Sequence, residues 1–121
     1  MDRVLVVEDD DDIRDLIVLA LTGRGLRVHD FADPVAALDF ASTATCDAAV
    51  LDWSMPRMHG GELCARLREL PHLRDAPVVI VTAHADAETR DRATAAGATR
   101  FVTKPFSLKQ LAEVVVDLLA G

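Results

Sequence analysis

The sequence offers few means of stabilisation other than a hydrophobic core. It has two cysteines, no tyrosine and one tryptophan among 121 residues. Because two cysteines are too few for a disulfide framework and no apolar signal segment is visible, we expect Cys46 and Cys64 to be reduced intracellular thiols. No apolar stretch reaches the length of about 20 residues that a membrane-spanning helix needs. We therefore expect a cytoplasmic protein without membrane attachment.

Positive charge is also scarce. Lysine and arginine together number 13, against 20 aspartate and glutamate residues, which gives a net charge of −7. An acidic surface repels a phosphate backbone and provides no counterion release on binding. We therefore expect no direct nucleic-acid binding.

Five short apolar runs predict five strands, at residues 4–7, 26–31, 48–51, 78–81 and 101–102. Four of these runs are unbroken, which is typical of parallel strands covered by helices on both faces. The run at 26–31 alternates in part, so we place it at an edge of the sheet. A length of 121 residues suits one domain, so we expect residues 1–121 to form a single domain with no output domain present.

Segments with the apolar spacing of helices lie between the strands, most clearly at 13–21 and 108–119. Their ends are marked by residues that start or stop helices, namely Gly23, Gly25, Asp33, Pro34, Gly60, Gly97 and Ser107. The order predicts an α/β fold of five strand–helix units, (βα)5, with a doubly wound parallel sheet. The fourth helix, about residues 87–96, has no large aliphatic side chain. We expect it to dock weakly and move most easily, with a closely packed alanine face as an equal alternative.

Reactive and charged residues stand at the carboxyl ends of four predicted strands. Glu8 and Asp9 follow the first strand, Asp52 the third, Thr82 the fourth and Lys104 the fifth. In an open parallel sheet these ends share one edge, where ligands bind. The sequence therefore predicts a site made of three carboxylates, a hydroxyl and an ammonium group.

The carboxylates of Glu8, Asp9 and Asp52 would repel one another strongly without a cation between them. Mg²⁺ prefers oxygen ligands and keeps several waters, so one or two carboxylates and a backbone carbonyl suffice. The alternative is a run of acidic residues at a helix start, which the helix dipole favours. We prefer that alternative for residues 10–12, with Asp10 or Asp11 as the cap, and the metal for Glu8 and Asp9.

Asp52 differs from the other acids because it follows a fully apolar strand and precedes a loop that contains Pro56. A carboxylate beside a metal ion can attack phosphorus and form an acyl phosphate. Lys104 would then pair with phosphoryl oxygens, and the Thr82 hydroxyl would donate to another oxygen. Taken alone, Lys104 would be a surface lysine and Thr82 a strand-end cap.

Four blocks of sequence resemble those of response-regulator receiver domains. They are VEDD at 7–10, LDWSMP at 51–56 with Gly60 beyond it, VTA at 81–83 and TKPF at 103–106. The resemblance spans almost the whole chain, and four blocks at compatible spacing are far more specific than any one of them. It implies a flavodoxin-like fold with strand order 2-1-3-4-5.

The resemblance also implies roles for individual residues. Asp52 would accept a phosphoryl group from a histidine kinase, a phosphotransfer protein or a small phosphodonor. Mg²⁺, which Mn²⁺ can replace, would be held by Glu8 or Asp9, by Asp52 and by the backbone carbonyl of Ser54.

Such a domain is a signalling switch of a two-component system and catalyses only its own phosphorylation and dephosphorylation. Lys104 and Thr82 would bind the phosphoryl group and, with the ring of Phe101, couple it to the face formed by the fourth helix, fifth strand and fifth helix. A downstream protein, or an output domain absent from this chain, would read that face. The upstream kinase or phosphotransfer protein would dock near the first helix.

Departures from the family pattern modify these expectations. Phe101 stands where a tyrosine is common, so any ring movement would depend on packing alone. Ser54 and His84 occupy positions that face the path of the hydrolysing water, so we expect the phosphoryl lifetime to depend on them. Thr99 and Arg100 stand where receivers of the dimerising, DNA-binding subclass often carry acidic residues, which argues against that dimer mode.

Rival functions fit the sequence less well. A metal-dependent phosphatase with an aspartyl nucleophile commonly needs a second acid two residues further on, where this chain has Ser54. A flavin carrier needs a loop rich in glycine and hydroxyls after its first strand, where this chain has Glu8 and four aspartates. A degenerate receiver that serves only as an interaction module is a further alternative. We expect His29, His59 and His72 to be ordinary surface residues, because their spacing does not suit a zinc site.

Overall fold

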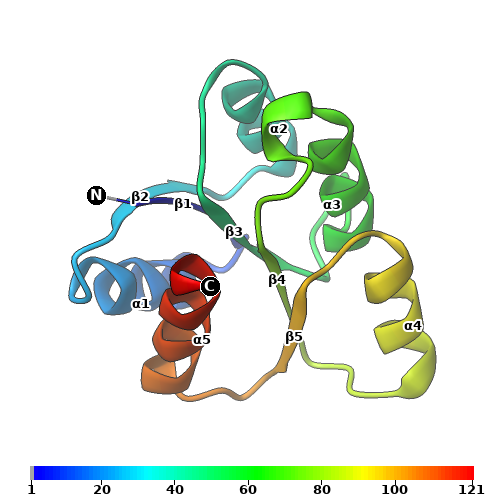
Figure 1. The fold of residues 1–121 in the computed structure, drawn as a ribbon. Helices are drawn as coiled ribbons and strands as arrows, with labels where there is room; N and C mark the ends of the chain where they lie inside the picture. The colour runs from blue at the N-terminus through cyan, green and yellow to red at the C-terminus, as the bar shows by residue number, and fades with distance from the viewer. Residues whose placement is uncertain (1) are drawn as a thin grey trace.

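The computed structural model describes residues 2–121, in which strands and helices alternate. The strands are β1 (Arg3–Val7), β2 (Arg27–Phe31), β3 (Ala48–Asp52), β4 (Val78–Thr82) and β5 (Arg100–Thr103). Neighbouring strands are parallel and lie in the order β2-β1-β3-β4-β5 (Figure 1). The predicted fold class, the strand order and the edge position of residues 26–31 are confirmed.

Helices cover both faces of the sheet. They are α1 (Asp11–Thr22), α2 (Pro34–Thr43), α3 (Gly60–Glu69), α4 (Ala87–Ala95) and α5 (Leu108–Ala120), with a short 3₁₀ helix, η1 (Pro71–Leu73). α1 and α5 lie on one face of the sheet, and α2, α3 and α4 lie on the other (Figure 1). Their buried side chains belong to two separate apolar clusters. Two apolar layers therefore enclose the sheet, as a doubly wound fold requires.

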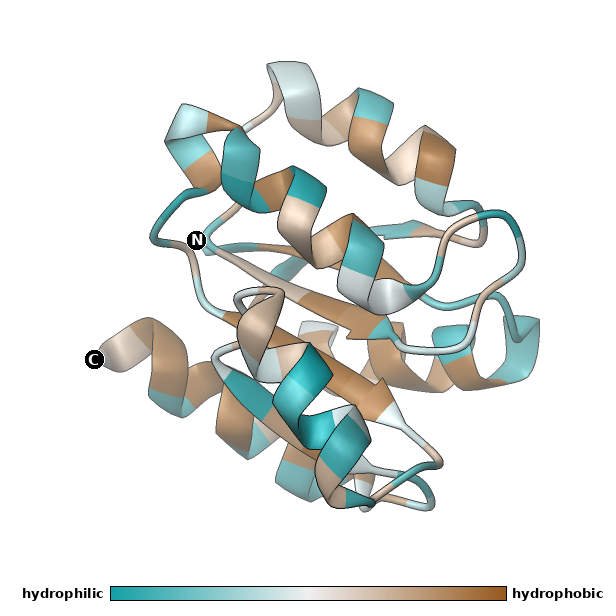
Figure 2. Cartoon of the chain, turned by 90° about the vertical axis from the view of Figure 1, so that its right-hand side faces the viewer, coloured by the Kyte–Doolittle hydropathy of each residue, from teal (hydrophilic) through white to brown (hydrophobic). Residues whose placement is uncertain are grey.

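The central strands are buried, as their unbroken apolar runs predict. Every residue of β3 and β4 is buried, whereas the edge strands β2 and β5 are partly exposed. Figure 2 shows the hydrophobic strands between helices that carry hydrophilic residues on their outer sides. Cys46 and Cys64 are both buried, with free thiols.

Side chains that accept N–H groups of the first turn begin the five α-helices and satisfy donors that would otherwise lack partners. Four of the caps are Asp10, Asp33, Asp86 and Ser107, on α1, α2, α4 and α5. The cap of α3 is His59, whose Nδ1 accepts the Gly61 N–H at 3.1 Å. His59 is exposed, as expected, but this capping role was not apparent from the sequence.

Two other histidines lie beside α2. The expectation of an ordinary surface residue is wrong for His29, which is half-buried and packs against Phe40, with the ring centroids 4.9 Å apart and the ring planes tilted by 39°. The cause is the packing of α2 against β2. His72 is exposed, and its Nε2 lies 2.7 Å from the Ala41 carbonyl oxygen.

The helix α4 buries two residues, Thr89 and Ala93. Figure 2 colours most of this helix as hydrophilic. Beyond its carboxyl end Gly97 has a φ of 105°, a conformation that favours glycine, so the predicted stop is confirmed. The small burial agrees with the expected weak docking.

Among residues 2–121, no helix combines the length and the apolar composition required to cross a bilayer.

Candidate functional site

The carboxyl ends of β1, β3, β4 and β5 meet at one edge of the sheet, as the strand directions require. In the strand register Asp52 pairs with Val81, and Thr82 pairs with Thr103, one residue before Lys104. Asp52 and Thr82 are 5% and 1% exposed. The buried rim therefore presents an acid and a hydroxyl on adjacent strands.

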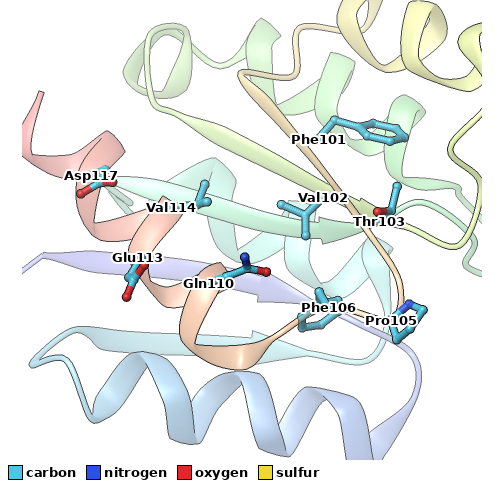
Figure 3. A pocket seen from close by; sticks show the side chains of 9 residues that line it. All are labelled: Phe101, Val102, Thr103, Pro105, Phe106, Gln110, Glu113, Val114 and Asp117. Atoms are coloured by element: carbon cyan, nitrogen blue, oxygen red, sulfur yellow. The ribbon is translucent and has the colours of Figure 1, made fainter.

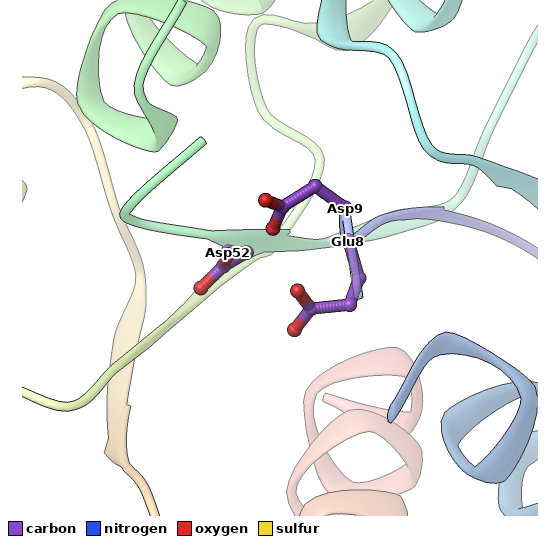
Figure 4. Close-up of side chains that lie close together, drawn as sticks. All are labelled: Glu8, Asp9 and Asp52. Carbon is purple, nitrogen blue, oxygen red and sulfur yellow. The ribbon is translucent and has the colours of Figure 1, made fainter. Parts of the chain in front are cut away.

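Three carboxylates come together at this edge. Ligand oxygens of Glu8, Asp9 and Asp52 lie within 4.8 Å of one another. Figure 4 shows Glu8 and Asp9 at the end of β1 and Asp52 at the end of β3, with their carboxylates converging. Within residues 2–121 this is the one group of three or more acidic, histidine or cysteine side chains close enough to share an ion. The sequence predicted that these three carboxylates would come together.

Lys104 joins the acidic cluster from the end of β5. Its Nζ lies 3.0 Å from Glu8 Oε1 and 3.1 Å from Asp52 Oδ1. Lys104 is half-buried, and Glu8 is 2% exposed. One ammonium group therefore serves two buried carboxylates, so Lys104 is not an isolated surface lysine.

The charges at this edge do not balance. Burial and the neighbouring Glu8 raise the pKa of Asp52 to about 7, although Lys104 acts in the opposite direction. Burial alone would lower the pKa of Lys104, but its hydrogen bonds to Glu8 and Asp52 raise it. A cation between the acids would relieve this excess of negative charge, and oxygen donors are the ligands that Mg²⁺ prefers. The residues present therefore fit a magnesium site.

The loop after Asp52 is fixed by backbone contacts. The Trp53 N–H donates to the Val81 carbonyl at 2.8 Å, and the Gly60 N–H donates to the Trp53 carbonyl at 2.8 Å. A Cβ atom on Gly60 would collide with the Asp52 carbonyl oxygen, so the close approach of these two backbone segments requires glycine at position 60. Ser54 lies exposed on this loop. Asp52 is thus presented by a rigid strand and a rigid turn.

Thr82 ends β4 with its hydroxyl in the turn that follows. Its Oγ1 accepts the His84 N–H at 3.0 Å, and its carbonyl accepts the Lys104 N–H at 2.6 Å. The hydroxyl therefore does act as a strand-end cap, and its own hydrogen is left to donate. His84 lies exposed on this turn.

Phe101 lies half-buried on β5, on the side of the sheet that α4 covers. The guanidinium carbon of Arg90 lies 5.1 Å from the centre of its ring.

Arg14 makes contacts beside the site that the sequence did not predict. Its guanidinium donates to the Glu8 carbonyl at 3.0 Å and pairs with Asp11 at 2.7 Å and Asp30 at 3.2 Å. The Asp10 N–H also donates to Glu8 Oε2, at 3.2 Å. A charged residue beside the apolar stripe of α1 was the available signal. Together these contacts fix the backbone that carries Glu8.

Fold and site together define a doubly wound α/β domain with a cation-competent acidic site at the carboxyl edge of its sheet. Residues 4–116 match the model of the response regulator receiver domain, and the chain belongs to this family. Members are signalling switches of two-component systems controlled by phosphorylation, not conventional enzymes, and they interact with histidine kinases and phosphotransfer proteins. The prediction of a receiver domain is confirmed.

Individual relatives agree with this assignment. The response regulator RpfG of Xanthomonas campestris pv. campestris, a cyclic di-GMP phosphodiesterase, is 34% identical over 119 residues, which cover 97% of this chain and 32% of that protein. The chain thus spans about a third of this curated relative.

Solved receiver structures agree as well. The chemotaxis protein CheY4 of Vibrio cholerae has a TM-score of 0.93 and 30% identity, with 98% of each chain covered. The receiver domain of the sensor histidine kinase PA1611 of Pseudomonas aeruginosa has a TM-score of 0.90 and 26% identity, with 99% and 98% of the two chains covered. That structure has magnesium coordinated in its active-site cleft.

Proposed function

We propose that this domain is a Mg²⁺-dependent phosphoacceptor and that Asp52 is the residue phosphorylated. The observation that carries the proposal is the position of Asp52, which is buried, held by a rigid turn and 3.1 Å from the Lys104 ammonium. A nucleophile in such a site needs little reorganisation before it reacts. The domain would catalyse only its own phosphorylation and dephosphorylation.

The transfer requires an in-line attack by an Asp52 carboxylate oxygen on phosphorus. A P–O bond to Asp52 forms while the bond from phosphorus to the donor breaks, and the donor leaves with that electron pair. The donor is a phosphohistidine of a kinase or phosphotransfer protein, or a small acyl phosphate. Lys104 remains protonated and pairs with phosphoryl oxygens, and the Thr82 hydroxyl donates to another. Hydrolysis removes the phosphoryl group when water attacks phosphorus and the Asp52 carboxylate leaves.

Glu8, Asp9 and Asp52 would hold the magnesium ion, together with the backbone carbonyl of Ser54. When bound, Mg²⁺ neutralises charge on the acids and on the transferring group. Mn²⁺ is expected to substitute because it accepts the same oxygen ligands. The acidic cluster supports this ligand set, and so does the magnesium reported in the PA1611 receiver domain.

An apolar groove beside the site suits the docking of a phosphodonor protein. Its volume is about 510 Å³, and its lining includes Ile13 and Leu16 of α1, Phe106 and Lys104. Leu16 is 48% exposed, which is unusual for so large an apolar side chain. A donor helix placed on α1 would bring its phosphohistidine to the edge of the sheet where Lys104 and Asp52 lie.

The output surface is proposed to be the face of α4, β5 and α5. A groove of about 460 Å³ lies there, and Figure 3 shows it between β5 and α5. Its lining includes Phe101 and Phe106 beside the acidic Glu113 and Asp117. A downstream protein or an output domain would read this face. The net charge of −7 favours a protein partner over nucleic acid, and the free buried thiols suit the cytoplasm.

Intact mass measurement after incubation with acetyl phosphate and Mg²⁺ tests the proposal. The wild type should gain one phosphoryl group, and the gain should require both Mg²⁺ and Asp52, so that Asp52→Asn gains none. Fluorescence of Trp53 should change in parallel, because the indole adjoins Asp52. If the wild type gains no mass and Trp53 responds to neither Mg²⁺ nor beryllofluoride, the domain is an interaction module instead.

A further inference from the structure

The ring of Trp53 links the loop after Asp52 to α4. This ring is largely buried: Gly61 leaves no room for a Cβ atom beside it, and the His59 ring packs against it in a tilted arrangement with centroids 5.0 Å apart. On α4, the guanidinium carbon of Arg92 lies 5.3 Å from the centre of the ring. A guanidinium at this distance is attracted by the electrons of an indole face.

This contact matters because α4 has little else to hold it against the loop. The helix buries Thr89 and Ala93 and has no large aliphatic side chain. An arginine on an aromatic ring therefore takes the place that an apolar side chain has on the other helices.

The carboxyl end of α4 is held against α3 by hydrogen bonds. Arg68 at the end of α3 donates to the Gly97 carbonyl at 2.8 Å and 3.1 Å, and to the Leu73 carbonyl at 3.0 Å. Gly97 directly follows the last turn of α4. Because these hydrogen bonds fix the carboxyl end of α4 to α3, the position of Arg92 on α4 is restrained, and so is its contact with the Trp53 ring.

We propose that Arg92 is a positioning residue for the phosphoacceptor loop: it fixes the ring of Trp53 and, through it, the backbone that carries Asp52 and Ser54. The inference rests on the proposed function of Asp52. By linkage, any shift of Trp53 on phosphorylation must change the docking of α4, and any shift of α4 must change the loop. This route is separate from the one through Thr82.

Trp53 is the single tryptophan, so its fluorescence reports this contact directly. In the protein without phosphodonor, Arg92→Gln should increase the quenching of Trp53 by acrylamide, and Arg92→Lys should restore part of the protection because it keeps a cation. The matched control is Arg90→Gln, on the same helix, because Arg90 lies over Phe101 and not over Trp53. Equal quenching in wild type and Arg92→Gln overturns the proposal.

The rate of phosphorylation by acetyl phosphate, followed by intact mass, tests the positioning role. Arg92→Gln should slow the reaction about threefold to fivefold, the factor expected from an arginine–aromatic contact at a partly exposed position. In a Trp53→Leu background the same substitution should have no further effect. Arg66→Gln, on the exposed side of α3, should react at the wild-type rate.

The two readouts separate the possible failures. If quenching increases but the rate is unchanged, Arg92 only packs on the ring and the positioning role is wrong. If Arg92→Gln slows the reaction equally in the Trp53→Leu background, Arg92 does not act through the ring and the proposal is also wrong. If the wild type gains no phosphoryl group, the proposed function of Asp52 fails and the positioning role fails with it, whereas increased quenching would still establish the structural contact.

Discussion

The helices α5 and α4 lie on opposite faces of the sheet beside β5, and they are held by different means (Figure 1). α5 buries three residues, Leu111, Ala112 and Val115. α4 buries Thr89 and Ala93. Its other contacts include arginines on aromatic rings and, just beyond its carboxyl end, the hydrogen bonds of Arg68 to Gly97. Since apolar burial contributes about 25 cal/mol per Å², α5 is the more firmly anchored helix. The domain thus combines a fixed helix and an adjustable one on the two sides of one strand.

The largest effect is expected from truncating the anchor of α5. Leu111 is 1% exposed, so Leu111→Ala leaves a cavity and should lower the free energy of unfolding by about 3 kcal/mol. Urea denaturation checks this value. Leu19→Ala is the matched control, because Leu19 is 69% exposed and should change stability by about 0.5 kcal/mol or less.

Truncation of the buried Ala93 on α4 tests whether this helix is held less firmly than α5. Ala93→Gly should cost about 1 kcal/mol, mostly from the lower helix propensity of glycine. A cost on α4 as large as that of Leu111→Ala would mean that the alanine face is closely packed, and the contrast between the two helices would be wrong.

Burial of the Asp52 carboxylate should lower the free energy of unfolding at neutral and alkaline pH. Burial raises the pKa of Asp52 to about 7, above its ordinary value of 3.8, so the folded protein binds a proton more tightly than the unfolded chain. Stability from this group is therefore complete at acid pH and is lost as pH rises towards and through 7. Without Mg²⁺, Asp52→Asn should exceed the wild type in unfolding free energy by about 2 kcal/mol at about pH 8.

Urea denaturation of both proteins at about pH 4 and about pH 8 measures this difference. It should be much smaller at the lower pH, where the folded protein holds the Asp52 proton and the unfolded chain, with the ordinary pKa of 3.8, is already about half protonated. Mg²⁺ at the higher pH should stabilise the wild type more than the variant. A pH-independent difference would show that burial of the Asp52 charge is not its cause.

The sequence predicted the features that depend on local pattern. Unbroken apolar runs indicated the buried strands, and polar residues after them indicated which side chains meet at the carboxyl edge. Asp52 and Lys104 lie far apart in the chain but are adjacent in space because parallel strands align their ends. The class of site therefore followed from the order of the elements.

Contacts between helices and loops were not predictable in this way. His59 caps α3 because its ring nitrogen faces the first turn, and neither histidine spacing nor the glycines beside it indicate this. The contact of Arg92 with Trp53 depends on how α4 is rotated, and a helix with few apolar residues gives no periodic signal for its rotation. Such contacts follow from tertiary packing.

Phosphoryl lifetime should depend on the two exposed residues beside the site. Ser54 follows β3, and His84 lies between Thr82 and the adjustable α4. Ser54→Ala and His84→Ala should each change the dephosphorylation rate by about fivefold, the effect of one hydrogen bond of about 1 kcal/mol to the attacking water. Loss of phosphorylated mass over time, after removal of the donor, measures the rate. Unchanged rates in both variants would reject this role.

The smallest effect is expected at the start of α4, where Asp86 accepts the Thr89 N–H at 3.0 Å. This hydrogen bond lowers the pKa of Asp86 below its ordinary value of 3.8, so the cap stabilises the helix above that value and is lost as pH falls below it. After correction for intrinsic rates, hydrogen exchange of α4 amides should accelerate on acidification severalfold more than that of α5, whose cap Ser107 does not titrate in this range. Asp86→Asn keeps an acceptor without a charge and should remove this pH dependence. Equal acceleration in α4 and α5 would mean that the two helices open together, and that α4 is not independently adjustable.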